Sequence, residues 1–462
     1  MPDPFMLSTT LNTAVLPGDN AARVLYLLLE IIPNTGLPLR RTPVNLALIV
    51  DASESMLIPS LDDDLVEELY RRGLLVETVA DGVPVFRVLD MPDDLAARAE
   101  PVCNMDFVQH ALRLLVERLN ADDRFALVAF AARAKTLVSN RSGADKRKML
   151  DVLDTLADGR LGDDTLLTAG LQAALGEAQR GQGGDRQTRL LLLTDGFVAD
   201  EARAKGVAAQ AATSGYPLST VGLGTTFNEG FLIDLAEMSG GNAHLVFRPA
   251  EIPGIFAAEL ESAQRIVARA IDVRIGLTPG VELRRVHRIH PVISELPLTD
   301  LQDRSLTLSL GALEREQPLA VLVELLCPPR PPGAYRLAQI VVTGDASGSQ
   351  PIRTMQRADI LVQVAPLGQP LPAPNPRVMK LVETVNTFKL QTRALADAAA
   401  GDISGATRKL QTAATRLLAD GEFELAQAVQ SEIANLEQQG QMSAAGAKKL
   451  RYETRKLTQK LG

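Results

Sequence analysis

The sequence of 462 residues has no tryptophan, few other aromatic residues and only two cysteines. Cys103 and Cys327 can form at most one disulfide, which excludes a disulfide scaffold in a chain of this length and favours a reducing compartment. Apolar residues make up 46% and charged residues 23% of the chain, so a disordered or collagen-like protein is excluded. At about 100 to 200 residues per domain, the length predicts two to four globular domains.

Long hydrophobic runs and a targeting signal are also missing. The longest apolar stretch near the start, residues 24–32, is interrupted by Glu30 and falls far short of the roughly 18 residues that a membrane span needs. The first twenty residues contain Pro2, Pro4 and two acids but no Lys or Arg, which is the reverse of a secretory signal. The sequence therefore predicts a cytoplasmic protein without a transmembrane segment.

An excess of basic residues is absent, and the charge is unevenly distributed. The net charge is −8, which argues against binding of nucleic acid along the whole surface. Eleven acids and four arginines between Met56 and Met105 give this stretch −7, whereas the last eighteen residues carry +5. A solvated surface is the simplest interpretation of each run when its position is ignored.

Alternating strand and helix patterns occupy the first half of the chain. Residues 5–32 predict two strands around a turn at residues 17–20, and the apolar run at residues 44–50 is typical of a strand buried in a parallel sheet. The following alternation predicts a doubly wound, mostly parallel α/β sheet. Its predicted strands are 124–130, 190–193, 217–222 and 242–247, and its helices 107–119, 149–156, 166–178, 200–213, 228–238 and 252–267.

The pattern changes after about residue 270. Short strands separated by Gly and Pro predict an antiparallel β-sandwich, to which the N-terminal strands belong, so the α/β domain is inserted into the sandwich. Five prolines in residues 366–376 indicate a stiff linker, and four helices follow it. We therefore divide the chain into N-terminal sandwich strands (1–43), an α/β domain (44–267) with an acidic insertion (57–103), the rest of the sandwich (268–365), the linker (366–376) and a helical C-terminal domain (377–462).

Oxygen-bearing side chains follow the predicted strands of the α/β domain at three places. Asp51, Ser53 and Ser55 form an Asp-x-Ser-x-Ser motif directly after the most apolar strand, Thr165 lies in a loop before a helix, and Asp195 follows another buried strand. Ligands bind at the carboxyl ends of the strands in such sheets. Hydroxyls and carboxylates suit a hard cation, so we expect Mg²⁺, or alternatively Mn²⁺ or Ca²⁺. Taken singly, the first motif could equally be a helix N-cap.

These motifs, in this order, resemble the metal-ion-dependent adhesion site (MIDAS) of the von Willebrand factor A (VWA) domain. Residues 123–130 look like the second strand of that family, and residues 221–241 look like its fifth strand with the following helix and turn, so the resemblance covers about 44–267. It implies that a partner protein completes the metal site with an Asp or Glu side chain. Glu54 departs from the family, which usually has Gly at this position.

The resemblance also assigns roles to the five site residues. It implies that the hydroxyls of Ser53, Ser55 and Thr165 bind the metal directly. It implies that Asp51 and Asp195 hold the metal largely through water.

The acidic insertion is unusual because the family pattern resumes only at Asn104. Residues 62–72 predict a helix, and residues 75–79 and 83–88 predict a hairpin. One hypothesis is that a carboxylate among Asp62, Asp63 and Asp64 occupies the open metal position when no partner is bound. The alternative is a solvated surface subdomain.

Catalytic motifs are not found. The chain has no phosphate-binding Walker motif and no Gly-x-Ser-x-Gly elbow, and Phe227 stands where a dinucleotide fingerprint would need its third Gly. His287 and His290 lie on opposite faces of a predicted strand, so they cannot share one metal. With no base predicted beside a nucleophile, we expect neither catalytic residues nor an organic cofactor, and a protein that is not an enzyme.

The sequence thus predicts a metal-dependent protein-interaction adaptor that resembles bacterial intracellular VWA proteins. One alternative is an accessory, chaperone-like or chelatase-like, subunit of an AAA-type ATPase complex. A second is an adaptor in Ser/Thr kinase and phosphatase signalling. The basic tail either closes the helical bundle or forms an amphipathic helix for a membrane or an acidic partner.

Overall fold

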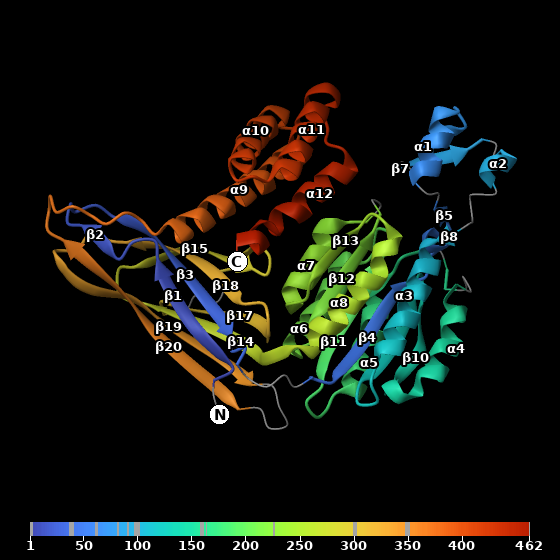
Figure 1. The fold of residues 1–462 in the computed structure, drawn as a ribbon, viewed down its shortest axis with the longest axis horizontal. Helices are drawn as coiled ribbons and strands as arrows, with labels where there is room; N and C mark the ends of the chain where they lie inside the picture. Colours follow the sequence, from blue (N-terminus) through green and yellow to red (C-terminus); the bar gives the residue numbers. More distant parts are fainter. Residues whose placement is uncertain are drawn as a thin grey trace. The chain divides into compact units, whose positions relative to one another are not determined.

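The computed structural model describes residues 3–36, 41–60, 63–80, 83–89, 92–96, 102–157, 161–162, 164–224, 227–298, 303–346 and 352–461 (Figure 1). The chain divides into two compact units: unit 1 consists of residues 1–42 and 262–462, and unit 2 of residues 43–261. Among the described helices, none combines the length and hydropathy that a membrane crossing requires.

Unit 2 is built on a six-stranded mixed sheet with the order β10-β9-β4-β11-β12-β13. Strands β4 and β11 are buried along their whole length because apolar residues pack on both faces of the sheet. All neighbouring strands are parallel except β10, an antiparallel edge strand that the sequence analysis did not predict. The strands are β4 (Val44–Asp51), β9 (Arg124–Phe130), β10 (Ala134–Ser142), β11 (Gln187–Thr194), β12 (Leu218–Leu223) and β13 (Ala243–Val246).

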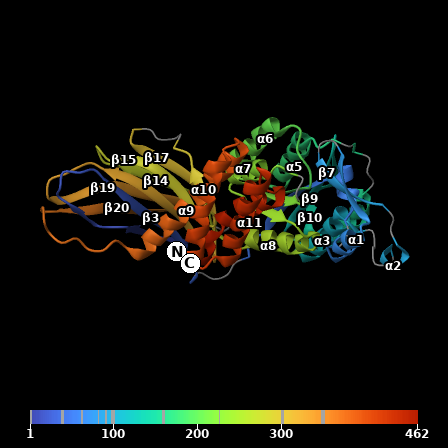
Figure 2. The same cartoon turned by 90° about the horizontal axis from the view of Figure 1, so that it is seen from above.

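Helices cover both faces of this sheet. Figure 2 shows α5, α6 and α7 on one side of the sheet and α3 and α8 on the other. Helix α8 ends at Gln264 rather than at residue 267, because the chain enters a sandwich strand at Ile266. The helices are α3 (Asn104–Arg118), α4 (Lys146–Leu153), α5 (Leu167–Gly181), α6 (Glu201–Thr213), α7 (Glu229–Ser239) and α8 (Ile252–Gln264), with short 3-10 helices η1 (Glu54–Leu57), η2 (Gly143–Asp145), η3 (Asp154–Ala157) and η4 (Pro249–Glu251).

The acidic insertion contains the predicted helix and hairpin. Its two ends pair as short strands, β5 (Pro59–Ser60) and β8 (Val102–Cys103), and between them lie α1 (Asp63–Arg71), the hairpin β6 (Leu75–Ala80) and β7 (Val83–Val88), and α2 (Asp93–Ala96). Leu65, Leu69 and Leu95 form a small separate core. The hypothesis that a carboxylate among Asp62, Asp63 and Asp64 binds the metal depends on side chains that lie outside the described part of the chain.

Unit 1 contains the predicted sandwich of two five-stranded sheets, with the orders β1-β3-β18-β15-β16 and β17-β14-β19-β20-β2. The N-terminal segment forms three strands rather than two, since Thr13 turns the chain by hydrogen bonding to Val15 and sends β2 to the other sheet. The strands are β1 (Phe5–Leu11), β2 (Val15–Pro17), β3 (Arg23–Pro33), β14 (Ile266–Leu277), β15 (Glu282–His290), β16 (Ser294–Leu296), β17 (Ser305–Glu314), β18 (Leu319–Cys327), β19 (Gly333–Ala346) and β20 (Arg353–Ala365).

Four helices follow the proline-rich segment and pack on the sandwich. Their common core includes Leu28, Ala320 and Leu322 from the outer face of the first sheet, and Arg377 binds both carboxylate oxygens of Glu30 at 2.6 and 3.0 Å. Within the basic tail, Leu450 and Leu457 are buried in this core. The elements are α9 (Pro376–Ala399), α10 (Ile403–Ala419), α11 (Phe423–Gln439), α12 (Ala444–Arg455) and the 3-10 helix η5 (Leu457–Leu461).

Candidate functional site

The carboxyl ends of β4 and β11 bring two carboxylates to one edge of the unit 2 sheet. Asp51 is the last residue of β4 and is fully buried, and Asp195 directly follows β11 and is nearly so. The Asp51 carboxylate accepts a hydrogen bond from the Ser53 backbone N–H at 2.9 Å and another from the Thr194 hydroxyl at 2.5 Å. Because β4 and β11 are adjacent and parallel, residues about 140 positions apart in sequence meet here.

The two serines of the motif connect these carboxylates. The hydroxyl oxygens of Ser53 and Ser55 lie 3.0 Å apart, and the Ser55 hydroxyl donates to Asp195 Oδ1 at 2.6 Å. The other oxygen of Asp195, Oδ2, accepts a hydrogen bond from the Asn104 side-chain amide at 3.2 Å. The structure therefore gathers four of the five predicted site residues into one hydrogen-bonded group.

Thr165 approaches the same group from the loop before α5. A Cβ atom on Gly196, the residue after Asp195, would lie 3.7 Å from Thr165 Oγ1 and 4.0 Å from Ser55 Oγ. The Asp200 carboxylate fixes the start of α5 by accepting hydrogen bonds from the backbone N–H groups of Leu167 and Thr168 at 2.9 and 3.1 Å. All five predicted residues thus lie around one point at the edge of the sheet.

Burial raises the pKa of both carboxylates, and the charge of Asp51 acts on Asp195 as well. Burial raises the pKa of Asp195 to about 6, the Ser55 hydrogen bond opposes this rise, and the negative charge of Asp51 adds to it. Burial also raises the pKa of Asp51, although hydrogen bonds from Ser53 and Thr194 partly oppose the rise. A cation near these two buried carboxylates would stabilise their ionised forms.

The set of donors fits a hard divalent cation. Three hydroxyls and two carboxylates offer oxygen atoms only, which Mg²⁺ and Mn²⁺ prefer, and the groups that hold Asp51 among the described residues are neutral. In the part of the chain that the structure describes, no cluster of three or more His, Cys, Asp or Glu side chains is found that could hold a metal, so a site here depends on the hydroxyl ligands as well as on the two carboxylates. Glu54 is exposed at the rim of the site.

Sequence reasoning missed three residues that support the site. Thr194 adjoins Asp195 in sequence, and Asp200 lies at the start of a predicted helix. The sequence analysis could have found both from these positions, but it gave neither a role. Asn104 had no local signal, because its partner Asp195 is 91 positions away.

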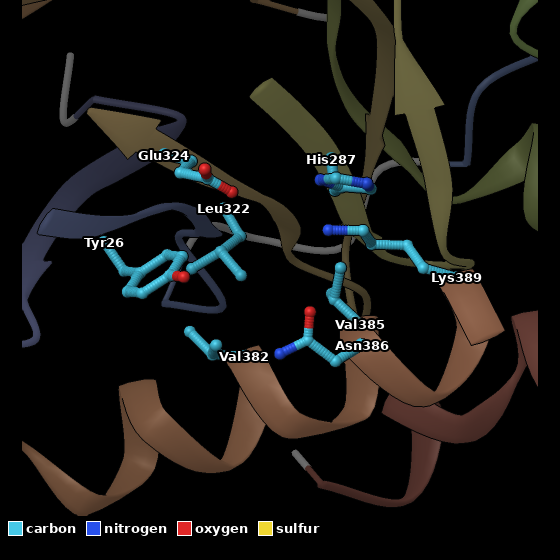
Figure 3. A pocket seen from close by; sticks show the side chains of 8 residues that line it. All are labelled: Tyr26, His287, Leu322, Glu324, Val382, Val385, Asn386 and Lys389. Atoms are coloured by element: carbon cyan, nitrogen blue, oxygen red, sulfur yellow. The ribbon is translucent and has the colours of Figure 1, made fainter. Parts of the chain in front are cut away.

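A second polar feature is a small cavity in unit 1 between the first sandwich sheet and α9 (Figure 3). His287 in its wall is almost fully buried, and its Nε2 has no hydrogen-bond partner among the described residues. Figure 3 shows the Lys389 ammonium group beside the His287 ring. Eight described residues line the cavity: Tyr26, His287, Leu322, Glu324, Val382, Val385, Asn386 and Lys389. None of these eight is a Ser, Thr or Cys that could act as a nucleophile. The edge of the unit 2 sheet therefore remains the candidate site.

Comparison with known families agrees with this geometry. Residues 103–257 match the von Willebrand factor type A domain, and residues 376–460 match the Sll0103-like C-terminal alpha-helical domain. The chain carries a VWA domain and an Sll0103-like helical domain. The helical match spans α9 to α12. The predicted fold class, a VWA-type α/β domain inserted in an antiparallel sandwich and followed by helices, is thereby confirmed.

Two curated relatives share parts of the chain. The uncharacterized protein sll0103 of Synechocystis sp. is 26% identical over 319 residues, which cover 67% of this chain and 74% of the relative. The uncharacterized protein YfbK of Escherichia coli is 27% identical over 182 residues, 38% of this chain and 31% of YfbK. The match thus spans less than a third of YfbK.

A solved structure has the same architecture over nearly the whole length. The von Willebrand factor type A protein from Catenulispora acidiphila superposes with a TM-score of 0.70, covering 97% of this chain and 96% of its own, at 14% sequence identity. At this identity the likeness establishes the fold alone. The combination of VWA domain, sandwich and helices is therefore shared with another protein.

Proposed function

We propose that this protein is a metal-dependent protein-interaction adaptor. Its VWA domain holds Mg²⁺ at the edge of the sheet, and the cation docks an acidic side chain of a partner protein. The VWA domain spans residues 44–267 in this proposal, with the insertion at 57–103. Five residues would hold the metal: Asp51, Ser53, Ser55, Thr165 and Asp195.

One observation carries the proposal: two buried carboxylates and three hydroxyls from separate segments meet at the carboxyl edge of the sheet. Ser53, Ser55 and Thr165 would bind the cation directly, and Asp51 and Asp195 would hold it largely through water. Neutral hydroxyls leave the cation with residual positive charge, which favours an additional carboxylate ligand. An Asp or Glu of the partner supplies that ligand.

The overall charge makes the cation necessary for such an encounter. The chain carries −8, and −7 of this lies between Met56 and Met105, next to the candidate site in sequence. An acidic partner is therefore repelled unless a local positive charge attracts it. We expect binding of the partner to be lost when the metal is removed by a chelator.

Calorimetry with Mg²⁺ on the full chain tests the metal site. Wild-type protein should bind one Mg²⁺, and Asp51→Ala should bind none that can be detected. Asp151→Ala is the matched control, since Asp151 is an exposed aspartate on α4 of the same domain. Equal Mg²⁺ affinity in wild type and Asp51→Ala would refute the proposed site.

Capture of partner proteins on the immobilised chain then tests the adaptor role. Retention should require Mg²⁺ in wild type, should be abolished by a chelator, and should be absent from Asp51→Ala at any Mg²⁺ concentration. Partners retained equally well without Mg²⁺ would contradict a metal-dependent adaptor even if the metal binds.

A further inference from the structure

The two residues that flank the acidic insertion hold the two oxygens of one carboxylate. Ser55 precedes the insertion and donates to Asp195 Oδ1 at 2.6 Å. Asn104 follows the insertion and donates to Asp195 Oδ2 at 3.2 Å. The proposed metal site is therefore connected to both ends of the insertion through Asp195.

The ends of the insertion are themselves joined. Pro59 pairs with Cys103 and Ser60 pairs with Val102 in an antiparallel two-stranded stalk, β5 and β8. Helix α3 begins at Asn104, directly after the stalk, and the Asp106 carboxylate accepts a hydrogen bond from the Cys103 backbone N–H at 2.7 Å. A displacement of the stalk must therefore move the start of α3, and Asn104 with it.

We propose that Asn104 is a positioning residue through which the insertion sets the metal affinity of the site. This inference rests on the proposed function, since it needs a cation held by Asp195. The Asn104 amide is a neutral donor, so it orients the carboxylate without adding a positive charge that would compete with the cation. By thermodynamic linkage, a ligand that shifts the stalk changes metal affinity, and the metal changes affinity for that ligand by the same factor.

Asn104→Ala is the first test, with Mg²⁺ affinity measured by calorimetry on the full chain. We expect the variant to bind Mg²⁺ about tenfold more weakly, as is usual when a group that orients a metal ligand is removed. Gln109→Ala is the matched control, because Gln109 lies on the same helix and donates one hydrogen bond to the Leu153 carbonyl at 3.0 Å. The control should keep wild-type affinity, and both variants should lose similar thermal stability without metal.

A variant without the insertion tests the coupling. Joining Ser60 to Val102 by a short Gly-Ser turn removes the separate small core of the insertion and keeps the stalk, Ser55 and Asn104. If the insertion acts through Asn104, this variant binds Mg²⁺ several-fold more weakly, and adding Asn104→Ala lowers the affinity by much less than in the full chain.

The outcomes separate this inference from the proposed function. Wild-type affinity in Asn104→Ala, or a full tenfold loss from Asn104→Ala in both backgrounds, would overturn the inference while leaving the metal site intact. A wild-type chain that binds no Mg²⁺ would instead overturn the proposed function. Circular dichroism and a melting curve on each variant confirm that a lost affinity does not come from misfolding.

Discussion

The polar groups around the candidate site and Glu259 in unit 2 differ in their hydrogen bonding from three buried side chains of unit 1, His287, Ser294 and Gln391. In unit 2, Asp51 and Asp195 are held by hydroxyl, amide and backbone donors, and Glu259 on α8 accepts bonds from Arg189, Ser219, Asn242 and His244 at 2.7 to 3.0 Å. In the described part of unit 1, buried atoms of His287, Ser294 and Gln391 have no hydrogen-bond partner.

The difference teaches where to look for function. A bonded set of buried groups has a fixed orientation, so it can present oxygen atoms to a ligand at the edge of the sheet. Isolated buried groups cost stability and orient nothing. The bonded pattern at the edge of the unit 2 sheet therefore marks a candidate site, whereas the unpartnered atoms of His287, Ser294 and Gln391 do not form one.

Glu259→Gln should produce the largest effect, and it breaks the bonded pattern in unit 2. Arg189 and His244 hold the pKa of Glu259 well below its ordinary value although burial opposes this, so the glutamate is ionised and paired. Removing one partner of such a buried pair costs about 3 to 5 kcal/mol. Hydrogen exchange in unit 2 should report this loss.

The control for this prediction is Glu261→Gln on the same helix, where the pair with Arg118 spans 3.6 Å at the surface. Surface pairs contribute less than about 1 kcal/mol. Because Arg189 lies near the start of β11 and the candidate site lies at its end, Glu259→Gln should leave Mg²⁺ affinity unchanged under native conditions. Equal stability of the two variants would contradict the comparison.

Leu410→Ala should give the next largest effect, and it tests the apolar core between the helices and the sandwich of unit 1. Leu410 is fully buried in the core shared by the helices and the sandwich, and a leucine-to-alanine change in such a core costs about 2 to 5 kcal/mol. Leu418→Ala, at a position 42% exposed on the same helix, should cost less than about 0.5 kcal/mol. Hydrogen exchange should confine the loss to unit 1; faster exchange in unit 2 would show that the units are not independent.

Mg²⁺ affinity should fall at low pH, which sharpens the comparison at the site itself. The pKa of Asp195 is raised to about 6, so without metal the folded protein holds a proton on this carboxyl below pH 6. The folding stability that this protonated carboxyl contributes is lost as pH rises through 6. Mg²⁺ replaces that proton, so its affinity should drop about tenfold per pH unit below 6 and depend less on this group above that pH. Calorimetry from pH 5 to 8 measures this, and a flat profile would contradict it.

His287→Leu should give the smallest effect, since it removes a buried imidazole whose Nε2 has no hydrogen-bond partner among the described residues. Burial lowers the pKa of His287 to about 4, so the stability linked to its neutral form is present above about pH 6.5 and is lost as pH falls towards 4. Between pH 7 and 5.5 the wild type should lose roughly 1 kcal/mol through this group. Over the same pH range, the free energy of unfolding of His287→Leu should fall by roughly 1 kcal/mol less than that of the wild type, as measured by denaturation at both pH values. An identical pH dependence of the two proteins would contradict a lowered pKa of His287.

The sequence analysis succeeded where burial leaves a run of apolar residues. Strands β4 and β11 were predicted from the apolar runs at residues 44–50 and 190–193, which are buried; Asp51 ends the first run, and Thr194 and Asp195 follow the second. Strand β10 was missed because only Val138 in it is buried, and no apolar run or clean alternation results. Asn104 could not be found either, because its role depends on a contact with Asp195 that exists only in the folded sheet.

The insertion of unit 2 into the sandwich has a consequence for synthesis of the chain. Strand β3 is complete at Pro33, but its neighbour β18 begins only at Leu319, after the whole of unit 2. At about 5 to 20 residues per second, a ribosome takes on the order of half a minute to make the intervening segment. During that time one edge of an apolar strand stays unpaired, so the rate of translation through the VWA domain sets how long this nascent chain is exposed to aggregation.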